Sequence, residues 1–244
     1  MTTQNIQIYL NSKTADKYVD GQTGNCYFHM PYIHVPESKK IHISVLNAQI
    51  PASFYNINHS NNTLVYSVND SAPITENIEV SNYNITTLIS YITSILSGFS
   101  ITYNNMSNKI TIQHNTFEFT IYKSSTCLEL LGLSNKDHIS NIRKIISDNV
   151  VNLFTTRMMY ICSDNFILNN IDSNSANISN ILQSIPITSA FNSIIHFTNS
   201  HDIPSEIYTT RNFTNLHIMI TNQDNVVFEF NNVHWSITLL LSIK

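Results

Sequence analysis

Charged side chains are scarce in this chain of 244 residues. Asp, Glu, Lys and Arg together make up 11% of it, against about a quarter in an average soluble protein. Asn, Ser and Thr take their place, while apolar β-forming residues run through the whole chain, which excludes a disordered protein. A neutral polar surface lacks the self-repulsion that keeps monomers apart. The composition therefore fits dense assembly, and it fits a simple bias in amino-acid usage equally well.

Basic clusters are missing as well. The formal net charge is −4, and Lys39-Lys40 and Arg143-Lys144 are the only adjacent basic pairs. A nucleic-acid groove needs a clustered basic stripe, so we expect no nucleic-acid partner.

Cysteines and long apolar runs are few. Cys26, Cys127 and Cys162 are an odd number and lie far apart, which argues against a disulfide framework or a paired metal site and suits a reducing compartment such as the cytosol. The most apolar stretch, residues 235–243, is too short to cross a bilayer as a helix. The first residues lack the basic and apolar regions of a signal peptide, so neither a membrane span nor secretion is expected.

Glycine is rare too, and no catalytic motif is present. The four glycines form no phosphate-binding loop, and neither GxSxG nor HExxH occurs. Asp148, Asp164 and Asp172 follow one another loosely, and a role in turns explains them better than acid–base chemistry does.

The histidines are the best remaining metal or catalytic candidates. His29 and His34 share one predicted strand, but their spacing of five puts them on opposite faces. His42, His217 and His234 lie in or beside strands without a Cys, Asp or Glu at ligand spacing. The sequence thus predicts no enzyme, no catalytic residue, no metal ligand and no cofactor.

What the chain does have is an alternation of apolar and polar residues, with a period of two. Apolar and polar residues alternate in many short runs separated by Asn-, Ser- and Asp-rich turns, a pattern typical of a β-sandwich or barrel. Trp235 begins the last run and should be buried, since the positions that follow it alternate inward. The main predicted strands cover residues 26–35, 41–50, 216–221 and 235–243.

Two segments have a helical period instead. Residues 84–96 place isoleucines and leucines on one stripe, with Asn84 as a cap and Gly98 as a stop. Residues 126–131 have the spacing of a capping box and end at Gly132. Both lie within residues 63–149, which we interpret as a small α+β insertion into a mainly β jelly-roll sandwich.

The sandwich is then formed by residues 1–62 and 150–244. Residues 1–25 look like an extended arm with an alternating segment, Ile6, Ile8 and Leu10. Its apolar side needs a partner, either a neighbouring subunit, which would make it an intersubunit arm, or the chain's own sheet as a plain first strand.

Four blocks of sequence carry a family resemblance. They are, in order, ISVLNAQIPASFYNIN followed by NNTLVYS, then FSITYNNMSNKITI with LELLGL, then ILQSIPITSAFNSIIHF, and finally RNFTNLHIMITNQDNVVFEFNNVHWSITLLLSI. Together they cover most of the chain after residue 40. In this order the chain resembles the penton proteins of virophages, Polinton-like viruses and related large DNA viruses. One departure is the turn at residues 222–225, which lacks the Asp-x-x-Gly of the pattern, although Asn supplies similar turn geometry.

The resemblance implies a jelly roll, often with an insertion, in a structural protein of the virion. It further implies homopentamers at the five-fold vertices of an icosahedral capsid, with trimers of the major capsid protein as partners. Three other functions remain open from the residues alone. They are a minor or cement capsid protein, a carbohydrate- or receptor-binding sandwich using tyrosines such as Tyr32, Tyr83 and Tyr208, and a metal-dependent enzyme on a cupin-like jelly roll.

Overall fold

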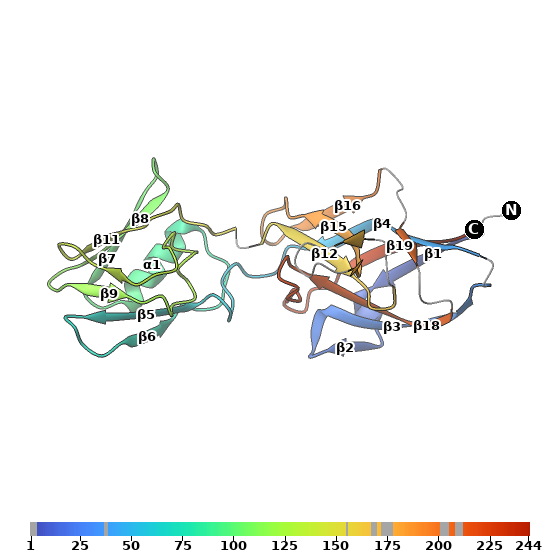
Figure 1. Ribbon diagram of the computed structural model, residues 1–244, viewed down its shortest axis with the longest axis horizontal. Helices are drawn as coiled ribbons and strands as arrows, with labels where there is room; N and C mark the ends of the chain where they lie inside the picture. Colours follow the sequence, from blue (N-terminus) through green and yellow to red (C-terminus); the bar gives the residue numbers. More distant parts are fainter. Residues whose placement is uncertain are drawn as a thin grey trace. The chain divides into compact units, whose positions relative to one another are not determined.

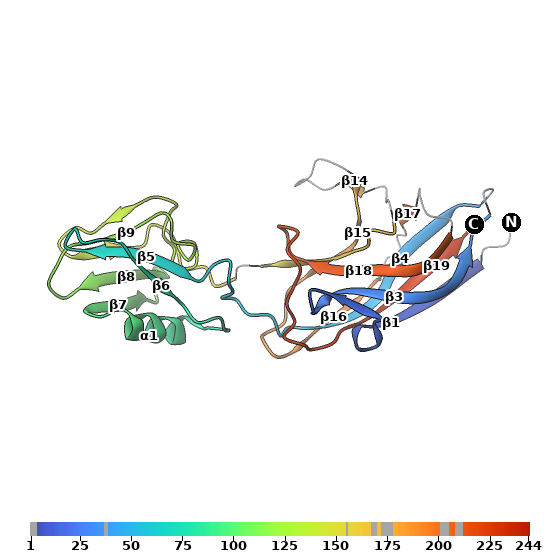
Figure 2. The same cartoon turned by 90° about the horizontal axis from the view of Figure 1, so that it is seen from below.

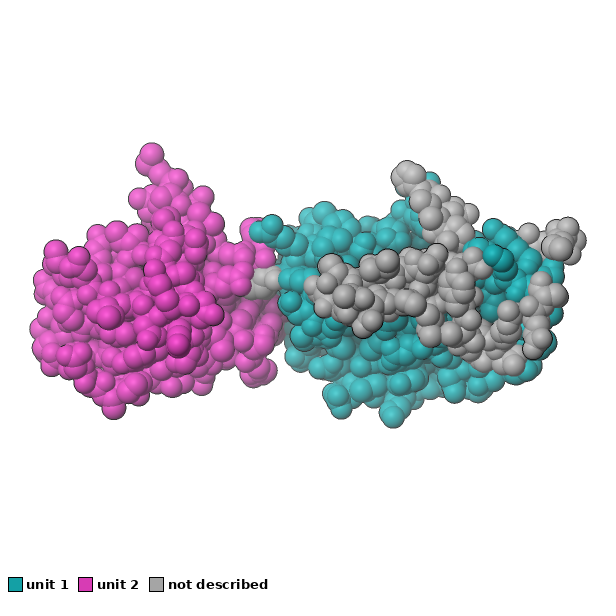
Figure 3. Space-filling view, in the orientation of Figure 1, with its two compact units in different colours: residues 1–54, 156–244 teal, residues 55–155 magenta. Residues whose placement is uncertain are grey.

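The computed structural model divides into two compact units (Figure 3). The first contains residues 1–54 and 156–244, and the second contains residues 55–155. The structure describes residues 4–36, 39–154, 156–166, 170–171, 178–200, 205–207 and 212–244. The second unit thus begins and ends a few residues outside the insertion expected at residues 63–149.

The first unit is a jelly-roll sandwich of two antiparallel sheets (Figures 1 and 2). One sheet has the order β1-β19-β4-β16, and β17 also pairs with β4. Its strands are β1 (Gln4–Asn11), β4 (Ile41–Pro51), β16 (Ile194–Thr198), β17 (Ser205–Ile207) and β19 (Ser236–Ile243).

The facing sheet has the order β15-β12-β18-β3-β2. Its strands are β2 (Lys17–Val19), β3 (Gln22–His34), β12 (Met158–Cys162), β15 (Ile181–Pro186) and β18 (Asn212–Thr221). The short strands β13 (Asn170–Ile171) and β14 (Ile178–Ser179) pair with each other, and a 3-10 turn, η1 (Ser12–Thr14), follows β1. All four main strands expected from alternation are present.

A single core fills the space between these two sheets. Alternate residues of β3, β18 and β19 enter it, as the sequence pattern predicts, and β4 does the same on either side of a register shift between Val45 and Asn47. Trp235, directly before β19, is 1% exposed, which confirms its predicted burial. Its Nε1 donates to the Thr23 carbonyl at 2.7 Å, and its ring meets Phe28 edge-on.

The first strand corrects the expectation of an extended arm. Residues 4–11 form β1, which pairs along its whole length with β19. Ile8 and Leu10 are buried in the chain's own core, and Ile6 packs against it. Pairing with β19 satisfies both the backbone and the apolar side of this segment, so the alternative of a plain first strand describes it.

The second unit has two smaller sheets around its own core. One has the order β10-β9-β5-β6, and the other has the order β11-β8-β7. Their bounds are β5 (Thr63–Val68), β6 (Ile74–Asn77), β7 (Phe99–Asn104), β8 (Lys109–His114), β9 (Phe119–Ile121), β10 (His138–Ile139) and β11 (Lys144–Ile146).

The helix α1 (Ile85–Ile95) confirms the first helical prediction. Asn84 caps it in a reciprocal capping box with Thr87, and Gly98 follows with φ +81°. Leu88 and Ile92 are fully buried in the core that β7 and β8 also line. In the part of the chain that the structure describes, no helix is long and apolar enough to span a membrane.

The second predicted helix, at residues 126–131, is wrong. The segment is a series of turns. It has one backbone hydrogen bond of α-helical spacing, from the Leu131 N–H to the Cys127 carbonyl. The Thr126 hydroxyl accepts the N–H of Thr63 on β5 and is therefore not a helix cap. A segment of six residues with one such hydrogen bond is too short to propagate a helix.

Replacing Ile92 by Asp should unfold the second unit, because an unpaired buried carboxylate costs roughly 3–5 kcal/mol. Hydrogen exchange resolved by mass spectrometry should show residues 55–155 losing protection. Ser90→Asp, which places the same charge on the exposed side of α1, is the control and should stay protected. Full protection in Ile92→Asp would contradict the packing described.

Gly132→Ala should destabilise the second unit by roughly 2–4 kcal/mol. Gly132 has φ +70°, and an added Cβ would lie 2.5 Å from the Asn149 carbonyl oxygen. Gly21 has nearly the same φ, +72°, with open space around it, so Gly21→Ala isolates the backbone strain and should cost about 1 kcal/mol in its own unit. The two losses in free energy of unfolding can be measured by denaturant titration followed by hydrogen exchange. If Gly132→Ala and Gly21→Ala lose the same amount, the steric contact at Gly132 is absent.

Candidate functional site

Two buried histidines are the structure's main polar centres, one in each unit. His217 lies on β18 in the first unit, and His138 lies on β10 in the second, and each faces an aspartate. The other predicted candidates are not gathered with them. His29 and His34 are exposed on β3 and form no cluster.

His217 is held on the outer side of its sheet by three groups. Its Nδ1 donates to Asp164 at 3.0 Å, and its Nε2 lies 2.6 Å from the side-chain oxygen of Asn25. The ring stacks on Tyr27 with 4.1 Å between centroids. Both nitrogens are therefore engaged, and the ring is covered on one face, so His217 fastens the segment carrying Asp164 to the sheet.

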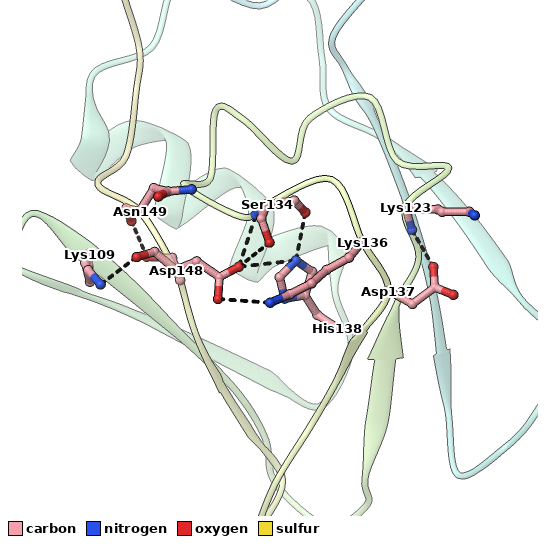
Figure 4. Close-up of polar contacts among 9 residues, drawn as sticks. Lys109, Lys123, Ser134, Lys136, Asp137, His138, Asp148 and Asn149 are labelled. Atoms are coloured by element: carbon pink, nitrogen blue, oxygen red, sulfur yellow. Dashed lines mark hydrogen bonds and ion pairs between the residues drawn. The ribbon is translucent and has the colours of Figure 1, made fainter.

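Asp148 organises the second centre (Figure 4). Its Oδ2 accepts the hydroxyl of Ser134 at 2.5 Å and the N–H of Ser134 at 3.2 Å. Lys136 lies 3.5 Å from its Oδ1, and His138 lies 3.7 Å from its Oδ2. The Lys109 ammonium donates to the backbone carbonyl of Asp148 at 2.7 Å, which ties β8 to the same segment.

Ser134, His138 and Asp148 are the residue types of a hydrolase triad, but their arrangement is different. The Ser134 hydroxyl donates to Asp148, and no bond joins it to the imidazole. The Nε2 of His138 lies 2.9 Å from the Ser134 carbonyl oxygen, which can only accept a hydrogen bond, so this nitrogen carries a hydrogen and donates it. A general base must accept the nucleophile's proton, so this cluster acts as a clip that closes residues 134–148.

The pKa of Asp148 is lowered from 3.8, chiefly by the hydrogen bond from the Ser134 hydroxyl. The Ser134 N–H, Lys136 and His138 act in the same direction, while partial burial opposes them. The carboxylate form is thus the one that the clip requires.

The cysteines are poor nucleophiles. Burial raises the pKa of Cys26 and of Cys127 to about 12, so neither thiol is ionised at neutral pH. Cys162 is a buried thiol as well. Over the described ranges, no group of three or more His, Cys, Asp or Glu side chains is placed to hold a metal ion.

Sequence reasoning named Asp148, Asp164 and His217 but not their pairing, and it missed His138. His138 and Asp148 are ten residues apart, whereas His217 and Asp164 meet across 53 residues through sheet pairing that spacing does not reveal. Asp172 and Tyr208 lie outside the described residues. Tyr32 and Tyr83 fall in different units, and Tyr83 packs against Tyr91.

Residues 38–240 match a protein family of unknown function, DUF5901. The chain belongs to this family. No curated protein matches this DUF5901 member in sequence.

This chain has the fold of the mavirus penton protein, as the family resemblance predicted. The two structures superpose with a TM-score of 0.53 at 12% sequence identity, covering 99% of this chain and 100% of the mavirus protein. A chain in the cryo-EM structure of the Sputnik virophage is also similar, with a TM-score of 0.46 and 13% identity over 98% of this chain and 97% of that one. The fold assignment depends on the first similarity alone.

Asp148→Asn should destabilise the second unit at pH 7 by about 1 kcal/mol, a low value for a charged hydrogen bond because Asp148 is partly exposed. The lowered pKa makes this contribution fully present above pH 3.8 and removes it as the pH falls through the folded-state value. Denaturant titrations should therefore show the difference from wild type shrinking below pH 3.8.

Asp70→Asn is the matched control, since it removes a carboxylate from an exposed turn without such bonds, and it should leave stability nearly unchanged. A loss in Asp148→Asn that persists unchanged in acid would show that the carboxylate charge is not what the clip uses.

Proposed function

We propose that the chain is a structural protein of a virion, namely a penton protein that forms homopentamers at the five-fold vertices of an icosahedral capsid. The observation that carries this is the similarity to the mavirus penton protein, which extends over the full length of both chains and so includes the insertion as well as the sandwich. Trimers of a major capsid protein would surround the pentamer.

The surface of the first unit suits such assembly. A closed ring joins one face of each subunit to a different face of the next. Neutral Asn, Ser and Thr side chains can pair across a wet interface at low desolvation cost. Large apolar side chains are also exposed there, among them Tyr9, Tyr32, Phe191, Ile194 and Val233.

The open edge of β1 is the intersubunit contact that we favour. Among the described residues β1 ends its sheet and pairs with β19 on one side, and no described strand pairs with its other side, which presents backbone groups to a partner. Ile8 and Leu10 point into the chain's own core, whereas Tyr9 is 75% exposed on the opposite face. A neighbouring subunit would therefore meet the backbone edge and Tyr9, with Ile6 at its margin.

We propose no catalytic role and no cofactor. The two histidine centres use their nitrogens and hydroxyls in bonds that hold the fold, and the thiols are buried. Buried cysteines in the thiol form suit synthesis in the host cytoplasm before incorporation into the capsid.

The assignment is tested by mass and by position. Purified protein at high concentration should give five copies by native mass spectrometry, with dissociation on dilution. Symmetry-resolved density of particles should place the chain at the five-fold vertices. Density elsewhere, or a trimer or monomer within the particle, would replace this assignment with that of a minor or cement capsid protein.

Tyr9→Lys should lower the pentamer fraction roughly tenfold or more, because a lysine at an open edge opposes strand addition. Val226→Lys adds the same charge at another exposed apolar position of the first unit and should leave the pentamer intact. Equal behaviour of the two variants would rule out β1 as the contact while leaving the position on the particle to decide the function.

A further inference from the structure

One turn of the second unit is held by a histidine nitrogen. β8 ends at His114, and the imidazole Nδ1 of this residue accepts the backbone N–H of Thr116 at 3.1 Å and that of Phe117 at 2.9 Å. A ring nitrogen that accepts hydrogen bonds carries no hydrogen, so the hydrogen of the neutral ring lies on Nε2. The turn therefore requires the neutral imidazole in this one tautomer.

Asparagine holds comparable turns elsewhere in the chain. At four of them a side-chain amide oxygen accepts the N–H group two residues ahead, from Asn11, Asn58, Asn152 and Asn222. Asn104, between β7 and β8, accepts the N–H groups two and three residues ahead at 2.9 and 3.1 Å, which is the pattern of His114. An amide oxygen does not titrate near neutral pH, whereas an imidazole does. The chain thus has a titratable acceptor at a position where asparagine would serve.

The imidazole is enclosed, so it cannot turn away when it is protonated. His114 is 7% exposed, and its ring lies edge-on to Phe99 at 4.8 Å and tilted to Phe117 at 5.8 Å between centroids. On the Nε2 side the backbone of Gly98 is so close that an added Cβ would lie 2.9 Å from that nitrogen. A proton on Nδ1 would face two N–H donors beside aromatic rings, which is unfavourable.

The charged groups at this turn do not offset such a proton. The guanidinium of Arg143 donates to the Asn115 carbonyl at 2.9 Å and so brings a positive charge to the same turn. The carboxylate of Glu118 is engaged elsewhere, by the N–H of Arg143 and the hydroxyl of Ser140. The neighbours that α1 and β7 contribute to the ring carry no charge. Among the described residues, no carboxylate pairs with this imidazole.

The turn joins the two sheets that enclose the core of the second unit. β8 belongs to the sheet β11-β8-β7, and β9, which follows the turn, belongs to the sheet β10-β9-β5-β6. The Asn115 N–H donates to the Gly98 carbonyl, directly before β7, and the Glu118 carbonyl accepts the N–H of Asn69, directly after β5. Residues 115–118 are therefore bonded to both sheets, and loss of the histidine's two bonds would loosen the link between them.

We propose that residues 114–118 form an acid-sensitive latch. Protonation of His114 at Nδ1 turns the acceptor of two hydrogen bonds into a donor, which releases the N–H groups of Thr116 and Phe117 and opens the link between the two sheets. The folded turn excludes a proton that the unfolded chain binds, so the stability of the turn is full at neutral pH and falls as the pH is lowered. The latch does not depend on the proposed function.

Hydrogen exchange of the full chain, resolved by mass spectrometry, tests the latch when each rate is divided by the intrinsic rate at the same pH. Between about pH 7 and pH 5, wild-type peptides covering residues 114–119 should lose protection roughly tenfold or more. Peptides covering the asparagine-held turn at residues 104–107 should keep theirs. His114→Asn supplies an amide oxygen that does not titrate, so its protection over residues 114–119 should change little across this range.

His59→Asn is the matched control, because the same substitution removes an exposed imidazole from the same unit and should retain the wild-type loss. The carboxylate of Asp148 stays ionised over this range, since its pKa is lowered from 3.8. A second measurement does not depend on the folding of His114→Asn. Nitrogen NMR of the isotope-labelled wild-type imidazole should show Nδ1 without a hydrogen and Nε2 with one at neutral pH.

Unchanged protection in wild type, an equal loss in His114→Asn, or a hydrogen on Nδ1 at neutral pH would each overturn the proposal. Equal losses at residues 104–107 and 114–119 would also overturn it, since they would show general acid unfolding of the unit. None of these results changes the oligomer mass or the particle position that test the proposed function.

Discussion

The sandwich of the first unit depends on one strand that arrives last. β19 lies between β1 and β4, and nearly all of its residues are buried or half-buried. Trp235 at its start ties three segments together, because Ser12 exchanges two hydrogen bonds with its backbone and Thr23 accepts from its ring. Without β19, β1 would be separated from β4 and its partners. The core would also lose the four apolar side chains that β19 contributes, Ile237, Leu239, Leu241 and Ile243.

Much of this architecture is readable in the sequence because its cause is local. Alternation along residues 41–50 or 235–243 needs only one buried face, and the helix at Asn84 needs only its stripe and its cap. These features follow from neighbouring residues and were predicted correctly. The jelly-roll class followed from their repetition and from the family resemblance.

The errors come from contacts between distant segments. Thr126 has the spacing of a helix cap, but β5 takes its hydroxyl, and the turn that results is not helical. The alternating run from Ile6 to Leu10 was open between a partner subunit and the chain's own sheet, and only the position of β19 decides between them. The pairing of His217 with Asp164 depends on the sheet register in the same way.

The central place of β19 has a consequence for the order of events during synthesis. Residues 55–155 are translated before β12, β18 and β19, so the second unit can assemble its own core early. β1, β3 and β4 are made before all of these, and their apolar sides stay without these partner strands until β18 and β19 have been translated. The nascent chain therefore carries open strand edges with few charges to keep copies apart, and holding them unpaired is a task for chaperones.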